Sequence, residues 1–246
     1  MPDRCRRETA VKAMEGIYKM TRNLNVLGVA LAALMAMSWL ASTASAQFES
    51  EAESTNLTVS TNAMQKFAPT NGGGAIECTT IKATGTQSGK ANTTVTISPT
   101  YSNCETFLGA ATSVKTNGCQ YVFHIAKGST TGTTDIECSI KHDIGTIGGV
   151  TVFAETESTG VIEITVGSIC KYTIGAQTGL GFVSFKNTGS GTTQEVIVEP
   201  NVLGIKSSLV TNDFFCPAAG SSGTYTGTLH LTAETAGGSH VGVFVD

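Results

Sequence analysis

The chain has 246 residues and a formal net charge of −4, and all of its arginines precede residue 47. Residues 47–246 therefore keep 9 of the 15 basic and 16 of the 19 acidic side chains, a formal charge of 9 − 16 = −7. An acidic segment without arginine lacks the bidentate donors that recognise phosphates and base edges, and anionic lipids repel it. We therefore expect no nucleic-acid partner and no binding to anionic membranes.

The first 46 residues read as a secretory signal peptide. An apolar run follows Arg22 and ends in Ala44-Ser45-Ala46, a pattern typical of a cleaved leader. Its apolar core, Val26–Leu40, has 15 residues and is shorter than the ~20 that a membrane-spanning helix needs. We expect cleavage after Ala46, an over-extended N-terminus if translation starts at Met20, and no membrane span after cleavage. The protein is then secreted, and lies outside the cell or at its surface.

Residues 47–74 are predicted to be a flexible N-terminal segment, because they begin with acidic and polar residues and end in the turn-forming run Pro69–Gly74. Asn56–Ser60 alternates weakly and is a candidate first strand. From residue 75 onward, short runs rich in Thr, Val, Ile and Tyr alternate with Gly, Ser and Asn. This pattern predicts strands at 75–84, 93–98, 120–126, 134–140, 150–154, 161–166, 169–174, 181–186, 195–199, 202–210, 224–232 and 241–245.

The predicted fold is an all-β, disulfide-stapled antiparallel β-sandwich over residues 75–246. Several runs alternate with period two, as half-buried antiparallel strands do, and no helical run of ten residues follows Cys78. The motif Ile76-Glu77-Cys78-Thr79 returns as Ile136-Glu137-Cys138-Ser139, which is weak evidence of duplication. The sandwich is therefore predicted as one unit or as two tandem or duplicated halves, Ig-like or jelly-roll-like, with a sub-boundary near 127–135.

Six cysteines follow the leader, and their even number in an exported chain predicts three disulfides. No C-x-x-C pair occurs, so a zinc ribbon or a thioredoxin-like redox site is not supported. Neighbour pairing would close the shortest loops, whereas the repeat suggests Cys78–Cys119, Cys138–Cys170 and Cys104–Cys216, and the sequence leaves both open. The candidates are Cys78, Cys104, Cys119, Cys138, Cys170 and Cys216.

The stretch Tyr101–Tyr121 contains two of these cysteines and the turn dipeptide Asn117-Gly118. Because it has no partnered catalytic group, we interpret it as framework, a stapled strand–turn–strand corner. The four tyrosines after the leader are expected in core or corner positions, with hydroxyls bonded to the backbone.

Two segments resemble catalytic or phosphate-binding motifs but lack the structural context that these motifs need. Ser168–Lys171 matches S-x-x-K, but in a β-branched segment residues three apart face opposite sides. Gly85–Lys90 resembles a phosphate-binding loop, but its glycines are too close and Ala91 replaces the required hydroxyl, so a hairpin turn is expected.

The histidines and carboxylates also yield no predicted site. His124, His142, His230 and His240 are dispersed and are expected to be solvent-facing strand residues. The acidic pairs in 135–137 and 155–157 lack a calcium-loop pattern and are interpreted as solubilising charge. We predict no catalytic, cofactor-binding or metal-binding residue, and no cofactor.

The leader, the segment between Cys104 and Cys119 and the ending Gly223–Thr228 together resemble uncharacterised exported, β-rich proteins of soil bacteria. The terminal strand is also similar to those that close bacterial Ig-like and adhesive domains. This resemblance implies export and a β-rich fold, and it carries no assigned activity or site residue.

The function expected from the sequence is therefore that of a secreted, non-catalytic structural or interaction protein. Its partner would be an unknown extracellular protein or glycan. A carbohydrate- or surface-binding module of the adhesin type is the alternative, and a secreted hydrolase comes third. The hydrolase requires a histidine and a carboxylate that converge beside a nucleophile.

Overall fold

β-branched residues and two-residue alternation produce strands along nearly the whole described chain. The computed structural model describes residues 47–61, 63–70, 74–106, 108–126, 129–138, 140–147, 150–156, 160–211 and 216–246. The predicted leader lies outside them. The strands are β1 (Phe48–Ser50), β2 (Ser54–Ser60), β3 (Gln65–Ala68), β4 (Ile76–Ser88), β5 (Ala91–Asn92), β6 (Thr94–Thr106), β7 (Ala111–Lys115), β8 (Gln120–Ile125), β9 (Thr131–Glu137), β10 (Ile140–Ile147), β11 (Val150–Thr156), β12 (Ile162–Val166), β13 (Cys170–Ile174), β14 (Gln177–Thr188), β15 (Glu195–Ile205), β16 (Ser208–Leu209), β17 (Gly223–Thr226), β18 (Leu229–Glu234), β19 (His240–Val241) and β20 (Val243–Val245), with a 3₁₀ turn at Gly191–Thr193.

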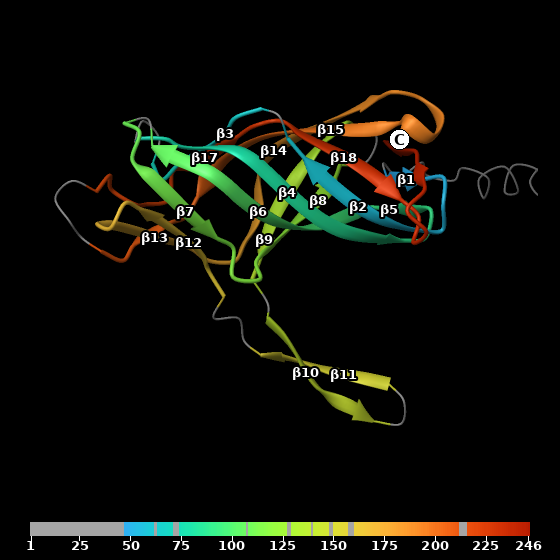
Figure 1. Ribbon diagram of the computed structural model, residues 1–246, viewed down its shortest axis with the longest axis horizontal. Helices are drawn as coiled ribbons and strands as arrows, with labels where there is room; N and C mark the ends of the chain where they lie inside the picture. The colour runs from blue at the N-terminus through green and yellow to red at the C-terminus, as the bar shows by residue number, and fades with distance from the viewer. Residues whose placement is uncertain are drawn as a thin grey trace, which may run out of the picture. The chain divides into compact units, whose positions relative to one another are not determined.

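The main sheet closes on itself as an eight-stranded antiparallel barrel (Figure 1). Two of its eight strand positions are each filled by two shorter strands in succession, β2 with β3 and β17 with β18. The order around the barrel is β2/β3, β4, β6, β8, β9, β14, β15 and β17/β18. Closure comes from the pairing of β2 with β18 and of β3 with β17. The all-β prediction is confirmed, whereas the sandwich is not: the sheet curls until its first and last strands pair.

A side sheet, a three-stranded sheet and a separate hairpin accompany the barrel. The strands β7, β12, β13 and β16 extend from the end of β6 as a side sheet (Figure 1). β1 pairs with both β5 and β20, so the first and last described strands lie together. The backbones of Gln47 and Asp246 exchange two hydrogen bonds of 3.1 Å. β10 and β11 form a separate hairpin.

The structure differs from the predicted domain boundaries at two places. Residues 47–74, predicted as a flexible segment, contain β1, β2 and β3, and Phe48, Leu57 and Val59 are buried. Acidic neighbours mask this burial in the sequence, because only alternate residues face inward. The predicted sub-boundary near 127–135 coincides with β9, which pairs with β8 and β14 inside the barrel. Ser45–Asp246 is one compact unit.

Three disulfides join the six cysteines in neighbour order: Cys78–Cys104, Cys119–Cys138 and Cys170–Cys216. The first links directly opposed residues of β4 and β6. Each such link typically stabilises a fold by ~2–4 kcal/mol. Three disulfides fit an oxidising extracellular setting. Within the described ranges, no helix is long and apolar enough to span a membrane.

Candidate binding site

One end of the barrel is hollow. A cavity of about 60 Å³ lies between the inner face of the barrel and the side sheet. Its lining comes from nine barrel strands and from β7, β12 and β13, so the side sheet covers this end. Among the described residues, no charged side chain lines it, and most of the wall is aliphatic or aromatic. A small and mainly apolar space is what such barrels offer a small ligand.

Alternation along the strands brings tyrosines to this cavity. On β6, Val95, Ile97 and Pro99 are buried, and Tyr101 continues the same face. Asn103 then adopts a left-handed conformation, with φ 53°, and the inward face resumes at Cys104. Tyr101 is therefore the last residue of the regular inward row.

Two further tyrosines arrive from other strands. Tyr121 on β8 pairs with the inward Ile97, so its side chain shares that face. Tyr225 on β17 pairs with both Phe67 and Val202, which also line the cavity. Gln65 lies two residues before Phe67 on β3 and faces the same way.

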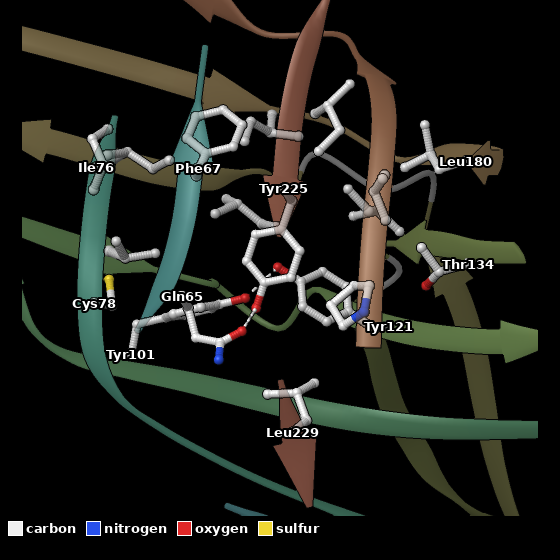
Figure 2. A pocket seen from close by; sticks show the side chains of 18 of the residues that line it. Gln65, Phe67, Ile76, Cys78, Tyr101, Tyr121, Thr134, Leu180, Tyr225 and Leu229 are labelled. Atoms are coloured by element: carbon white, nitrogen blue, oxygen red, sulfur yellow. Dashed lines mark hydrogen bonds between the residues drawn. The ribbon is translucent and has the colours of Figure 1, made fainter. Parts of the chain in front are cut away.

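The polar ends of these four side chains meet inside the cavity, as Figure 2 shows. The Tyr101 and Tyr121 hydroxyls lie 2.6 Å apart. The Tyr225 hydroxyl donates to Gln65 Oε1 at 3.0 Å. We call these residues the tyrosine network.

Gln65 holds the network in place where the chain is interrupted between β2 and β3 and between β17 and β18. Its side chain is fully buried, and Nε2 faces the Ala63 carbonyl at 3.1 Å and the Thr228 carbonyl at 2.9 Å. It also lies 3.2 Å from the Thr61 hydroxyl. Gly227 lies against this amide, and a Cβ atom there would displace it. The interrupted strands thus leave backbone carbonyls that the Gln65 amide and the Thr61 hydroxyl satisfy.

Burial keeps the phenols of the network protonated. It raises the pKa of Tyr121 to about 12, although the hydrogen bond from Tyr101 acts in the opposite direction. Burial also raises the pKa of Tyr101 and of Tyr225, and the charges of neighbouring phenolates add to both increases. The network is therefore neutral at physiological pH and acts through hydrogen bonds.

A second hollow, a groove of about 220 Å³, lies outside the cavity and shares only Ile76 with it. Its wall includes the exposed Leu108 and Ile169 and the buried Tyr172. The Tyr172 hydroxyl already donates to the Pro217 carbonyl at 2.8 Å. The groove therefore lacks the convergent polar groups that the cavity has, and we take the cavity as the candidate site.

Three histidines lie on strands with partly or largely exposed side chains, as the sequence predicts, and each also pairs with a carboxylate. His124 Nε2 lies 2.9 Å from Asp135 Oδ2, and Asp135 Oδ1 accepts the Gly179 N–H. His230 pairs with Glu195 at 3.1 Å, and His240 lies 3.5 Å from Glu234. The side chain of His142 lies outside the described residues.

These pairs do not form a hydrolytic site in the described part of the chain. No serine, threonine or cysteine there hydrogen-bonds to the paired imidazoles, which lie on half-exposed outer faces. Cross-strand pairing accounts for them, as it does for Lys171 of the S-x-x-K match, which bonds to Glu163 at 2.9 Å. In the phosphate-loop look-alike, residues 85–88 belong to β4 and the turn lies at Gly89-Lys90. Over the described ranges, no group of three or more His, Cys, Asp or Glu could hold a metal ion.

The sequence did not predict the tyrosine network, although the stretch that begins at Tyr101 and ends at Tyr121 stood out. Cys104 and Cys119 tie this stretch to β4 and to Cys138, as framework, while the terminal tyrosines meet in the cavity. The expectation that tyrosine hydroxyls bond to the backbone holds for Tyr172 alone among the four. Two tyrosines on inward positions were a usable signal, but Gln65 and Tyr225 join them only through barrel closure.

Comparison with known proteins adds no relative: no family model, curated protein or solved structure matches the chain significantly.

Proposed function

We propose that this protein is a secreted, non-catalytic binding protein that holds a small, mainly apolar molecule inside its barrel. The observation that carries the proposal is the cavity, in which the buried Gln65 and three partly buried tyrosines converge within an apolar wall. Ligand sites commonly combine these two features, because apolar surface supplies affinity and a few polar groups fix orientation.

Catalysis receives no comparable support. The network phenols have raised pKa values because of burial, so none is poised as a base near neutral pH. A polar group that stays neutral and hydrogen-bonded is suited to recognition.

Xenon provides a direct test, because it enters apolar cavities without needing a polar partner. Under xenon pressure, NMR signals of the methyl groups of Ile136, Leu180 and Val202 should shift, since these residues line the cavity. Those of Val183 and Val196, fully buried outside the cavity lining, should not. The variant Val202→Leu adds a methylene group and should weaken the xenon response. Unchanged cavity methyls in the wild-type protein would contradict the proposal.

Glycan binding is the second candidate, and one surface feature favours it. Phe182 is 70% exposed on the outer face of β14, directly opposite Asn201, and Leu203 beside it is 54% exposed. Ser184 donates to Glu199 one step along the same face. An exposed ring flanked by amide and carboxylate groups can stack on a sugar. Loss of polysaccharide binding in Phe182→Ala, with the barrel intact, would support this function.

A further inference from the structure

The cavity and the groove beside it follow one another along the inner face of the side sheet. On β13, Ile174 lines the cavity, whereas Tyr172 and Cys170, the next residues on the same face, line the groove. On the neighbouring β12, Ile164 lines the cavity and Val166 lines the groove. Because alternate residues of a strand lie ~7 Å apart on one face, the two hollows are separated by a single step along the sheet.

The barrel wall shows the same succession. Phe67 on β3 lines the cavity, and Pro69, two residues further on, lines the groove. Ile76 on β4 pairs with Phe67, stands beside it in Figure 2, and lines both hollows. Its other partner, Thr106 on β6, lines the groove. Ile76 therefore stands at the boundary where one hollow meets the other.

The groove offers a ligand mainly apolar surface. Among the described residues that line it, none is charged, and its two side-chain hydroxyls already have partners. The Thr106 hydroxyl accepts the Ala110 N–H at 3.1 Å, and the Tyr172 hydroxyl donates to the Pro217 carbonyl at 2.8 Å. The polar groups that a ligand can reach are thus those of the tyrosine network, at the far side of Ile76.

The outer border of the groove carries two large apolar side chains that are exposed to solvent. Leu108, between β6 and β7, is 79% exposed, and Ile169, between β12 and β13, is 44% exposed. Single exposed apolar residues are ordinary, but two on one apolar hollow are typical of a surface that binds a partner or a ligand. The groove is therefore the side from which an apolar molecule can be received.

Volume and charge define what fits both hollows together. The cavity, at about 60 Å³, corresponds to roughly four to six water-sized positions at ~10–15 Å³ each, and the groove, at about 220 Å³, is several times larger. Among the described residues no charged side chain lines either hollow, and burying an unpaired ion is costly. A phenol hydroxyl both donates and accepts, so it can bond to either kind of neutral polar group.

We infer that the cavity and the groove form one elongated site for a neutral, chain-like apolar molecule with a single polar end. The polar end reaches the hydroxyls of the tyrosine network, and the apolar chain passes Ile76 and lies in the groove. This inference rests on the proposed binding function and names the ligand class, which extends beyond what the cavity alone could hold.

The test uses the straight-chain 1-alkanols from 1-butanol to 1-octanol, followed by methyl NMR. Val202 reports on the cavity and Val166 on the groove. We expect 1-butanol to shift the signals of Val202 alone and 1-octanol to shift both. Affinity should rise about fourfold for each added methylene group over the whole series. Octanoate at pH 8 should bind at least tenfold more weakly than 1-octanol, and equal affinities would overturn the requirement for a neutral ligand.

A substitution at the border of the groove separates the long chain from the short one. Leu108→Ser should lower the affinity for 1-octanol about threefold to fivefold and leave that for 1-butanol unchanged. Leu203→Ser is the matched control, because Leu203 is 54% exposed and lines neither hollow, and it should change neither affinity. Thermal melting of both variants reports whether they fold.

Three results would overturn the inference: an affinity that stops rising beyond about six heavy atoms, 1-octanol shifts confined to one hollow, or equal effects of the two serine variants. Xenon separates these failures from failure of the proposed function. If xenon and 1-butanol shift the cavity methyls while longer alcohols gain nothing, only the elongated site is wrong. If neither xenon nor any alcohol shifts them, the proposed function is wrong too.

Discussion

The two parts of the barrel interior solve the same packing problem differently. One part is filled by rings: Phe185 makes edge-to-face contacts with Phe48 at 5.2 Å and with Phe123, which also borders the cavity, at 6.3 Å between centroids. The other part keeps a cavity and places hydroxyls and an amide where apolar atoms could have filled the space. Packed rings contribute stability, whereas buried polar groups cost desolvation that hydrogen bonds only offset. The contrast indicates that the cavity part serves recognition and the ring-packed part holds the barrel together.

The largest loss of stability is expected from a substitution among the packed rings. Phe185→Ala should destabilise the protein by about 3–5 kcal/mol, because it deletes the ring that contacts two others and leaves a void. Urea unfolding followed by circular dichroism measures the change. Phe182→Ala is the matched control, since it lies on the same strand but is 70% exposed, and its effect should stay within about 0.5 kcal/mol. Equal effects would refute the assignment of stability to the ring-packed part.

Gly227→Ala should have a smaller effect, about 1–3 kcal/mol, because the added methyl group displaces the Gln65 amide from its carbonyl partners. Combined with Gln65→Ala, the substitution should cost much less than the sum of the two single changes, since the clash is gone. Gly175→Ala is the control, because a Cβ atom there meets nothing within 4 Å. An additive double variant would show that Gly227 and Gln65 do not interact.

Phenylalanine substitutions rank the network members. Tyr225→Phe should cost about 1–3 kcal/mol of unfolding free energy, because Gln65 Oε1 loses the donor that it needs. Tyr121→Phe should cost only about 0.5–1 kcal/mol, because it removes one bond between two hydroxyls and leaves the Tyr225–Gln65 bond in place. Chemical denaturation of both variants provides the comparison. The reverse ranking would contradict the role of Tyr225 as the donor that Gln65 Oε1 needs.

Alkaline pH should lower the stability of the protein through the tyrosines of the cavity part, whereas neutral pH should have no such effect. The pKa of Tyr121 is about 12 in the folded protein and near 10 when unfolded. The folded state thus binds more protons in this window, so stability is complete below pH 10 and falls as the pH rises from 10 toward 12. Urea midpoints at about pH 8 and about pH 11 should differ, and less so in Tyr121→Phe. Phenolate absorbance that develops near pH 10 without unfolding would show that the rings are not buried.

Local patterns in the sequence predicted much of the fold and little of the site. Alternation and β-branched residues identified most strands, including β8 and β12, because these signals act within a few residues. They could not distinguish a sandwich from a barrel, since closure depends on pairs such as Ser60 with His230. Gln65 was not singled out for the same reason. In sequence it is a polar residue in an acidic segment, and only the distant Thr228 and Tyr225 make it a buried anchor.

The closing pairs are also expected to form late in folding. Ser60 and His230 are 230 − 60 = 170 residues apart, whereas the disulfides span only 26, 19 and 46 residues. Contacts between distant residues form slowly, because a long loop must be ordered first. All six disulfide-bonded cysteines precede Gly223, where β17, the first of the two closing strands, begins. Oxidation can therefore be complete while the barrel is still an open sheet, and the last 24 residues convert that sheet into a container.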